Sequence, residues 1–212
     1  MLGLSTATLI SRLITLVIAL SFHEFAHAWT ANFFGDDTPR LHGRLTLNPL
    51  AHLDPIGSLM LVVAGFGWAK PVPVNMYALQ RRSRSAPMWV AVAGPLSNLL
   101  LAILAAIPFR FGLIPVSISN GVIPSAYNFL STFIQINLIL MIFNLIPLSP
   151  LDGEKVAQVL FPRSWVNFLD SIRPYGPLIL MGLLFILPKL GIDIIGWLIR
   201  PLFNIFWTLL VG

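Results

Sequence analysis

The segment HEFAH, residues 23–27, places two imidazoles and a carboxylate close behind the apolar run LITLVIAL. On a helix, side chains four residues apart lie on one face, about 6 Å apart along the axis, so His23 and His27 can bind one metal ion. Glu24 is offset by one position and points beside that ion. Two imidazole ligands with a neighbouring glutamate as general base are typical of hydrolytic zinc sites. The segment therefore predicts a zinc-dependent hydrolase.

Chance, a structural role and a signal peptide each account less well for this pattern. Chance assembly is expected at a frequency of about one in a thousand at this composition. A purely structural trio is costly, because ionisable groups in a membrane helix usually serve function. Arg12, the apolar run and Ala26-His27-Ala28 also resemble a signal peptide with its cleavage site. Several further apolar segments follow instead of a soluble domain, so we expect the motif to be retained.

A catalytic zinc site usually has three protein ligands and one open position, so a third ligand must come from elsewhere. The chain has no cysteine, which leaves histidine and carboxylate side chains. Asp152 follows an apolar segment in which Pro147 and Pro150 break the helix. Such a break is tolerated at membrane depth only where the backbone faces protein or a hydrated cavity. Asp152 is therefore the favoured third ligand, and His42 and His52 are its competitors.

Further polar residues are candidate neighbours of the site. Asn144 and Asn137, two helical turns apart, could donate to a substrate backbone or an oxyanion. Hydrogen bonding between helices is an equally good role for Asn137. Asn98 ends the segment AGPLSN, whose small residues favour close packing. His52 and Asp54, in NPLAHLDP, could fold back over the metal or lie in a surface loop.

The elements that must position these residues are membrane helices. The chain has 212 residues, of which 57% are hydrophobic and only 10% charged, and its mean hydropathy is +0.85. This composition indicates an integral membrane protein, with residues 1–212 forming a single domain. We predict an all-α, polytopic transmembrane helix bundle of about five to six segments, with a small β-hairpin at RLTLN or a re-entrant element at 56–69 after the first span. The expected spans are residues 6–33, 86–109, 124–147 and one or two segments within 174–212.

Basic residues indicate the topology rather than a nucleic-acid partner. The formal charge is +5, but the basic side chains are scattered among loops and form no basic helix. The loop 70–85 contains four Lys and Arg residues and no acid, which favours the cytoplasmic side. The segment 149–173 would then be a second cytoplasmic loop, two crossings later.

These motifs together resemble the site-2 proteases, a family of intramembrane zinc metalloproteases. HEFAH matches the first metal motif of the family, AGPLSN its small-residue motif, and NLIPLSPLDG its second metal motif. The similarity covers residues 15–155 and is strongest to short prokaryotic members. It implies that His23, His27 and Asp152 bind one zinc ion per chain, that Glu24 is the general base, and that Asn144 lies near the catalytic centre.

The resemblance also implies an activity and a setting. The family cleaves transmembrane segments of membrane-tethered proteins, so we expect a membrane-protein substrate, a lipid bilayer and a prokaryotic cell membrane. No PDZ or CBS module is recognisable. Two competing functions remain open: an inactive metal-binding scaffold, against which Glu24 argues, and a zinc-dependent transporter, which should show an inverted repeat.

Overall fold

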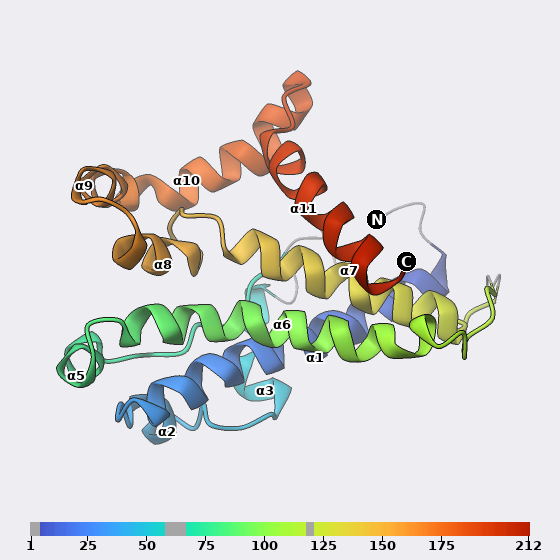
Figure 1. Cartoon of the computed structure of the whole chain (residues 1–212), viewed down its shortest axis with the longest axis horizontal. Coiled ribbons are helices and arrows are strands. Elements are labelled where there is room, and N and C mark those ends of the chain that lie inside the picture. The colour runs from blue at the N-terminus through green and yellow to red at the C-terminus, as the bar shows by residue number, and fades with distance from the viewer. Residues whose placement is uncertain (1–4, 58–66, 118–120) are drawn as a thin grey trace.

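The computed structural model describes residues 5–57, 67–117 and 121–212 (Figure 1). Helices make up 73% of the chain, and no strand is present among these residues, which confirms the all-α prediction. The helices are α1 (Thr6–Phe33), α2 (Thr38–Leu41), α3 (Pro49–His52), α5 (Met76–Arg82), α6 (Ala86–Arg110), α7 (Ala126–Asn144), α8 (Gly153–Leu160), α9 (Arg163–Ile172), α10 (Gly176–Met181) and α11 (Ile194–Leu210). A 3₁₀ turn (Arg173–Tyr175) precedes α10, and a π-helical turn (Gly182–Ile186) and a second 3₁₀ turn (Leu187–Leu190) follow it.

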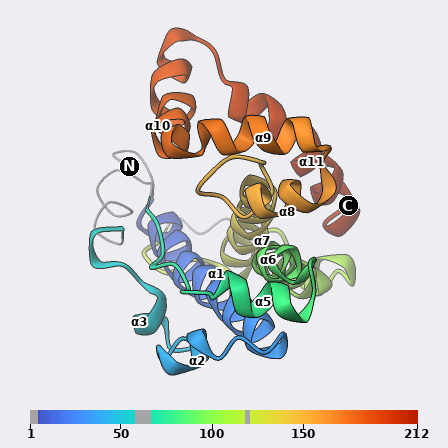
Figure 2. The ribbon, with the colours of Figure 1, turned by 90° about the vertical axis from the view of Figure 1, so that its left-hand side faces the viewer.

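Three long helices form the centre of the bundle. α1 packs against both α6 and α7, and α6 packs against α7. Figure 2, a view along the bundle, shows these three helices side by side in its lower half, with α9, α10 and α11 in the upper half. Small buried residues recur at every fourth position of α1, which lets its neighbours approach closely. They are Ala7, Ser11, Thr15 and Ala19, all with no exposed surface.

The contact between α6 and α7 contains the main apolar cluster. Ala102 and Ala106 of α6 face Ile134 and Leu138 of α7, and side chains from α11 pack against them. This cluster lies towards the end of α6 farther from Gly94, so it fixes the spacing of the helices without filling the region of the two histidines. The helix crossing therefore leaves room for polar groups nearer the other end of α6.

The described residues include four helical stretches long and apolar enough to cross a membrane, at Thr6–Phe33, Ala86–Arg110, Ala126–Asn144 and Arg163–Leu190. α11, with 17 residues, is a shorter apolar helix. The chain is therefore a membrane protein, and the first three predicted spans coincide with α1, α6 and α7. The predicted re-entrant element at 56–69 falls mostly outside the described residues.

One expectation about the connections needs correction. RLTLN, residues 44–48, forms no strand and contains a bend. The β contact described in this region is one isolated antiparallel bridge between Leu53 and Ala69. The helical stretch Arg163–Leu190 is not one straight helix. Its first part, α9, lies across the end of the bundle, and the chain changes direction at Pro174 before α10 begins (Figures 1 and 2). Proline lacks the amide hydrogen that would continue the helix.

Candidate metal centre

Three side chains from distant parts of the sequence meet at one point. His23 Nε2 lies 3.1 Å from Asp152 Oδ2, and His27 Nε2 lies 3.3 Å from the same oxygen. All three donor atoms lie within 4.8 Å of one another. Tetrahedral zinc, with bonds of about 2.1 Å, places its ligand atoms about 3.3 Å apart. The two imidazoles and the carboxylate therefore fit a single zinc ion, and they leave its fourth position open.

The other nitrogen of each histidine ring is bonded within the protein. His27 Nδ1 donates to the carbonyl oxygen of Val90 at 2.7 Å, and His23 Nδ1 donates to Asn98 Oδ1, also at 2.7 Å. Both acceptors belong to α6. With Nδ1 protonated, Nε2 of each ring keeps its lone pair for the metal. Helix α6 thus orients both imidazole ligands that α1 carries.

The orientation of the Asn98 amide is fixed by a second asparagine. Asn137 Nδ2 donates to Phe133 O, which can only accept, so Asn137 Oδ1 faces Asn98. Asn98 Nδ2 donates to that oxygen at 3.0 Å and to Ala19 O at 3.3 Å. Its own oxygen is therefore left for His23. This chain of bonds extends the support of the metal site from α6 to α7.

Gly94 brings the backbone of α6 against the two imidazoles. A Cβ atom at this position would overlap His27 Nε2 and His23 Nε2. The residue lies between Val90 and Asn98, which accept the hydrogen bonds of the two rings. Glycine is therefore required here for close approach, and this refines the general packing role expected for AGPLSN.

The turn that carries Asp152 is tightly packed. A Cβ atom at Gly153 would overlap the carbonyl oxygens of Leu145 and Ile146, so the chain doubles back closely after α7. Glu154, which is buried, forms an ion pair with Arg173 and ties α8 to the 3₁₀ turn that precedes α10. Burial raises the pKa of the Asp152 carboxyl, but when no metal is bound and the imidazoles of His27 and His23 are protonated, their charge and hydrogen bonds lower it by more, so the pKa lies below its ordinary value.

Glu24 faces a cavity of about 920 Å³ whose wall also includes all three donor residues. Its side chain is 9% exposed and forms no hydrogen bond with the described residues, so both oxygens are accessible from the cavity. The cavity continues between α1 and α7, away from the metal centre. The carboxylate can therefore meet a molecule that enters from the membrane part of the bundle.

Comparison with known proteins identifies the family of this chain. It is 42% identical over 180 residues to a Bacillus subtilis protein named "Putative zinc metalloprotease YwhC", and the match covers 82% of this chain and 80% of the relative. It is 33% identical to "Putative zinc metalloprotease Rip2" of Mycolicibacterium smegmatis, over 79% of this chain and 64% of the relative. The chain belongs to this zinc metalloprotease family. The Rip2 protein of Mycobacterium tuberculosis is 30% identical, over 90% of this chain and 70% of the relative.

No family model matches the chain, and no solved structure matches it either. The family and the donor set of two imidazoles and a carboxylate agree on zinc as the cofactor, with one ion per chain. The metalloprotease identity thus rests on the sequence relatives, and the geometry of the metal centre agrees with it.

The other predicted site residues lie in different environments. Asn144 lines the cavity; its Nδ2 donates to Leu140 O, and its Oδ1 forms no hydrogen bond with the part of the chain that the structure describes. Asn137 is fully buried and engaged with α6 and α7, so the structure places it behind the metal ligands rather than against a substrate. Asn98, predicted as a site neighbour, is bonded directly to His23.

The structure places the two loop histidines outside the group of donor atoms found among the described residues. His52 is fully buried and its Nε2 donates to Thr46 O at 2.7 Å, outside the group of donor atoms. The structure thus places the His52 ring within its own loop, apart from the donor atoms predicted to be its neighbours. His42 is exposed and bonded to Thr38 O, and Asp54 accepts from the amide of Gly57. Neither of these residues lines the cavity.

We expect the Asn98→Ala substitution to weaken zinc binding by about 10- to 100-fold, because His23 loses the acceptor that fixes its tautomer. Zinc affinity measured by competition with a chromogenic chelator tests this expectation. Asn128→Ala is the matched control: it removes an amide from α7 that forms no side-chain bond in the described structure. Equal zinc affinity of the two variants would show that the bond to His23 is dispensable.

Proposed function

We propose that this metalloprotease is an intramembrane endopeptidase of the site-2 type, which hydrolyses peptide bonds in transmembrane segments of membrane-tethered proteins. The observation that carries the proposal is the position of the donor group. His23 and His27 lie within α1, a helix long and apolar enough to span a membrane, and Glu24 faces a cavity that continues along that helix.

Each residue of the centre has a distinct task in this proposal. His23, His27 and Asp152 hold zinc, which when bound supplies Lewis-acid chemistry by making water acidic at neutral pH and by polarising a peptide carbonyl. Glu24 accepts the proton of the attacking water and delivers it to the leaving amine. Asn144, on the cavity wall, donates to the carbonyl oxygen or to the backbone of the substrate.

The cavity suits a substrate that has partly unwound. A helical peptide bond is shielded, so a membrane substrate must open locally, and its freed polar groups need partners in an apolar environment. Most of the cavity wall is apolar, but Thr132, Gln135 and Asn144 of α7 add polar side chains along one side. These groups can bond the exposed substrate backbone.

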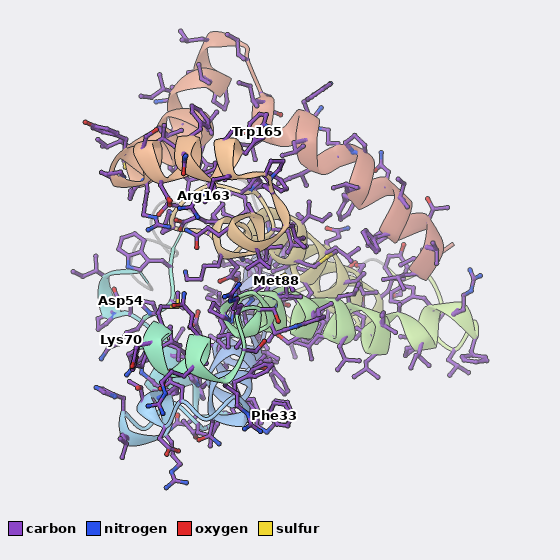
Figure 3. The ribbon with its side chains drawn as sticks, turned by 60° about the vertical axis from the view of Figure 1, so that its left-hand side comes forward. Phe33, Asp54, Lys70, Met88, Arg163 and Trp165 are labelled. Carbon is purple, nitrogen blue, oxygen red and sulfur yellow. The ribbon has the colours of Figure 1, made fainter. Side chains whose placement is uncertain are left out.

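The proposed topology places the metal-centre end of the bundle at the cytoplasmic face of a prokaryotic cell membrane. The segments 70–85 and 149–173, expected to be cytoplasmic, both adjoin this end. Figure 3, in which this end comes forward, shows Lys70 near α5 and Arg163 on α9. Lys and Arg are enriched on the cytoplasmic side of membrane proteins, which supports this orientation.

Removal of the metal tests the proposal directly. We expect the purified protein in detergent to contain one zinc per chain and to cut an apolar transmembrane test segment. Treatment with 1,10-phenanthroline should reduce cleavage to background, and added zinc should restore it, because the carboxylate of Glu24 cannot act without an acidified water. Zinc content is measured by mass spectrometry of the metal, and the cut site by peptide mass.

A water-soluble peptide with the same residues around the cut serves as the comparison substrate. If the protein cuts this peptide efficiently but leaves the transmembrane segment uncut, intramembrane proteolysis is contradicted. The metalloprotease activity itself would still stand. Zinc-loaded protein that cuts neither substrate would instead favour the metal-binding scaffold.

A further inference from the structure

Arg12 is a charged residue on the wall of the catalytic cavity, well away from the metal centre. The same cavity is lined by Thr8 and Arg12 near the start of α1 and by His23 and Glu24 farther along it. α1 is a continuous helix from Thr6 to Phe33, so Arg12 and Glu24 are separated by about 18 Å along its axis. Arg12 is thus placed to contact the distant part of a bound substrate.

No acidic residue of the chain neutralises Arg12. Among the described residues Arg12 forms no ion pair, and the segments 1–4, 58–66 and 118–120 contain no Asp or Glu. The eight acids all lie elsewhere, in the metal centre, in the loops after α1, or in pairs with Arg173 and Arg200. They are Glu24, Asp36, Asp37, Asp54, Asp152, Glu154, Asp170 and Asp193. Arg12 is also exposed, so its guanidinium is open to an anion from outside the chain.

A cation inside an apolar helix is expensive unless an anion or water reaches it, and such residues usually mark binding paths. The α7 side of the cavity supplies no anion, since its polar lining residues, Thr132, Gln135 and Asn144, are neutral. Because the cavity is continuous from Arg12 to the metal centre, a segment bound at Glu24 passes Arg12.

Resting on the function proposed above, we propose that Arg12 determines substrate specificity by binding an acidic side chain of the substrate segment. This side chain lies on the side of the cut that faces the start of α1. The separation of about 18 Å corresponds to about six residues of extended chain or about twelve of helix. The acidic side chain therefore belongs six to twelve residues from the scissile bond.

Binding of synthetic transmembrane peptides tests this assignment without relying on cleavage. Zinc-loaded protein carrying Glu24→Gln is titrated in detergent with fluorescent peptides of one apolar test sequence. Each peptide carries a single Asp, Asn or Lys at one position six to twelve residues from the expected cut. The same titrations are made with double variants in which Glu24→Gln is combined with Arg12→Gln or Arg12→Glu. The control combines Glu24→Gln with Arg110→Glu. Arg110 is exposed, ends α6 and does not line the cavity.

We expect the Asp peptide to bind about tenfold more tightly than the Lys peptide at one or more of these positions. Arg12→Gln should remove this preference and Arg12→Glu should reverse it, whereas Arg110→Glu should leave it unchanged. The reversal is informative because a structural defect would weaken the binding of all peptides alike.

An Asp-to-Lys affinity ratio that stays the same in Arg12→Glu would overturn the assignment. In that case a change in thermal stability that depends on anionic phospholipid would show that Arg12 pairs with a lipid phosphate. If the preference for Asp peptides depends on Arg12 but the wild-type protein cuts no substrate, the proposed protease activity is refuted. The role of Arg12 in binding would be retained.

Discussion

The Glu24→Gln substitution is expected to lower kcat/KM for a transmembrane substrate by about 10²- to 10⁴-fold while leaving zinc bound. Glutamine has nearly the same shape as glutamate but cannot accept the proton of the attacking water. Glu24 is not one of the three donor residues and forms no hydrogen bond with the described residues, so its replacement should not disturb the metal. Zinc content and single-turnover cleavage, measured on one preparation, test both parts.

Two further variants control this experiment. Glu24→Asp keeps a carboxylate at a greater distance from the metal, so we expect activity between those of the wild type and Glu24→Gln. Asp54→Asn changes an acid that accepts from the amide of Gly57 outside the cavity, and we expect full activity. Undiminished cleavage by zinc-loaded Glu24→Gln would exclude Glu24 as the base. Loss of zinc from this variant would instead indicate that Glu24 is a metal ligand.

The Gly94→Ala substitution, which adds one methyl group, is expected to abolish zinc binding and cleavage together. The new Cβ atom would occupy the space of the two Nε2 atoms. The rings cannot easily move away, because each is held by a hydrogen bond of 2.7 Å to α6. We expect zinc affinity to fall by at least about 100-fold, the upper end of the range for disturbed ligand orientation. Metal analysis after gel filtration gives the measurement.

Gly182→Ala is the matched control for Gly94→Ala. Gly182 is also helical, but a Cβ atom there would meet no other atom within 4 Å. Zinc binding should be unchanged, and the helix should become slightly more stable. Helical content by circular dichroism should be the same for both variants. A Gly94→Ala protein that keeps stoichiometric zinc would mean that α6 can withdraw from the imidazoles.

Local patterns in the sequence were sufficient to predict the central elements of this protein. The spacing of His23 and His27 depends only on helix periodicity, and three spans follow from apolar stretches of membrane length. Asp152 was the favoured third donor because a carboxylate follows a proline-broken helix, and the structure brings it to the imidazoles. These features are encoded within short windows of the chain.

Features that depend on partners distant in sequence were harder to predict. Nothing near Asn137 indicates that its amide orients Asn98 rather than a substrate, because the bond joins two helices. His52 resembles an exposed loop ligand in its local sequence, yet its ring is buried against Thr46. RLTLN alternates like a strand, but a strand also needs a pairing partner, and none is described beside it.

The hydrogen bond acceptors for both metal-binding rings come from α6, and the carboxylate donor comes 129 residues after His23. A growing polypeptide that has not yet reached Asp152 contains the base and both imidazoles but cannot complete the donor group. We therefore expect zinc binding to begin only after the turn that follows α7 has been synthesised, because one of the three donor residues is missing before that point.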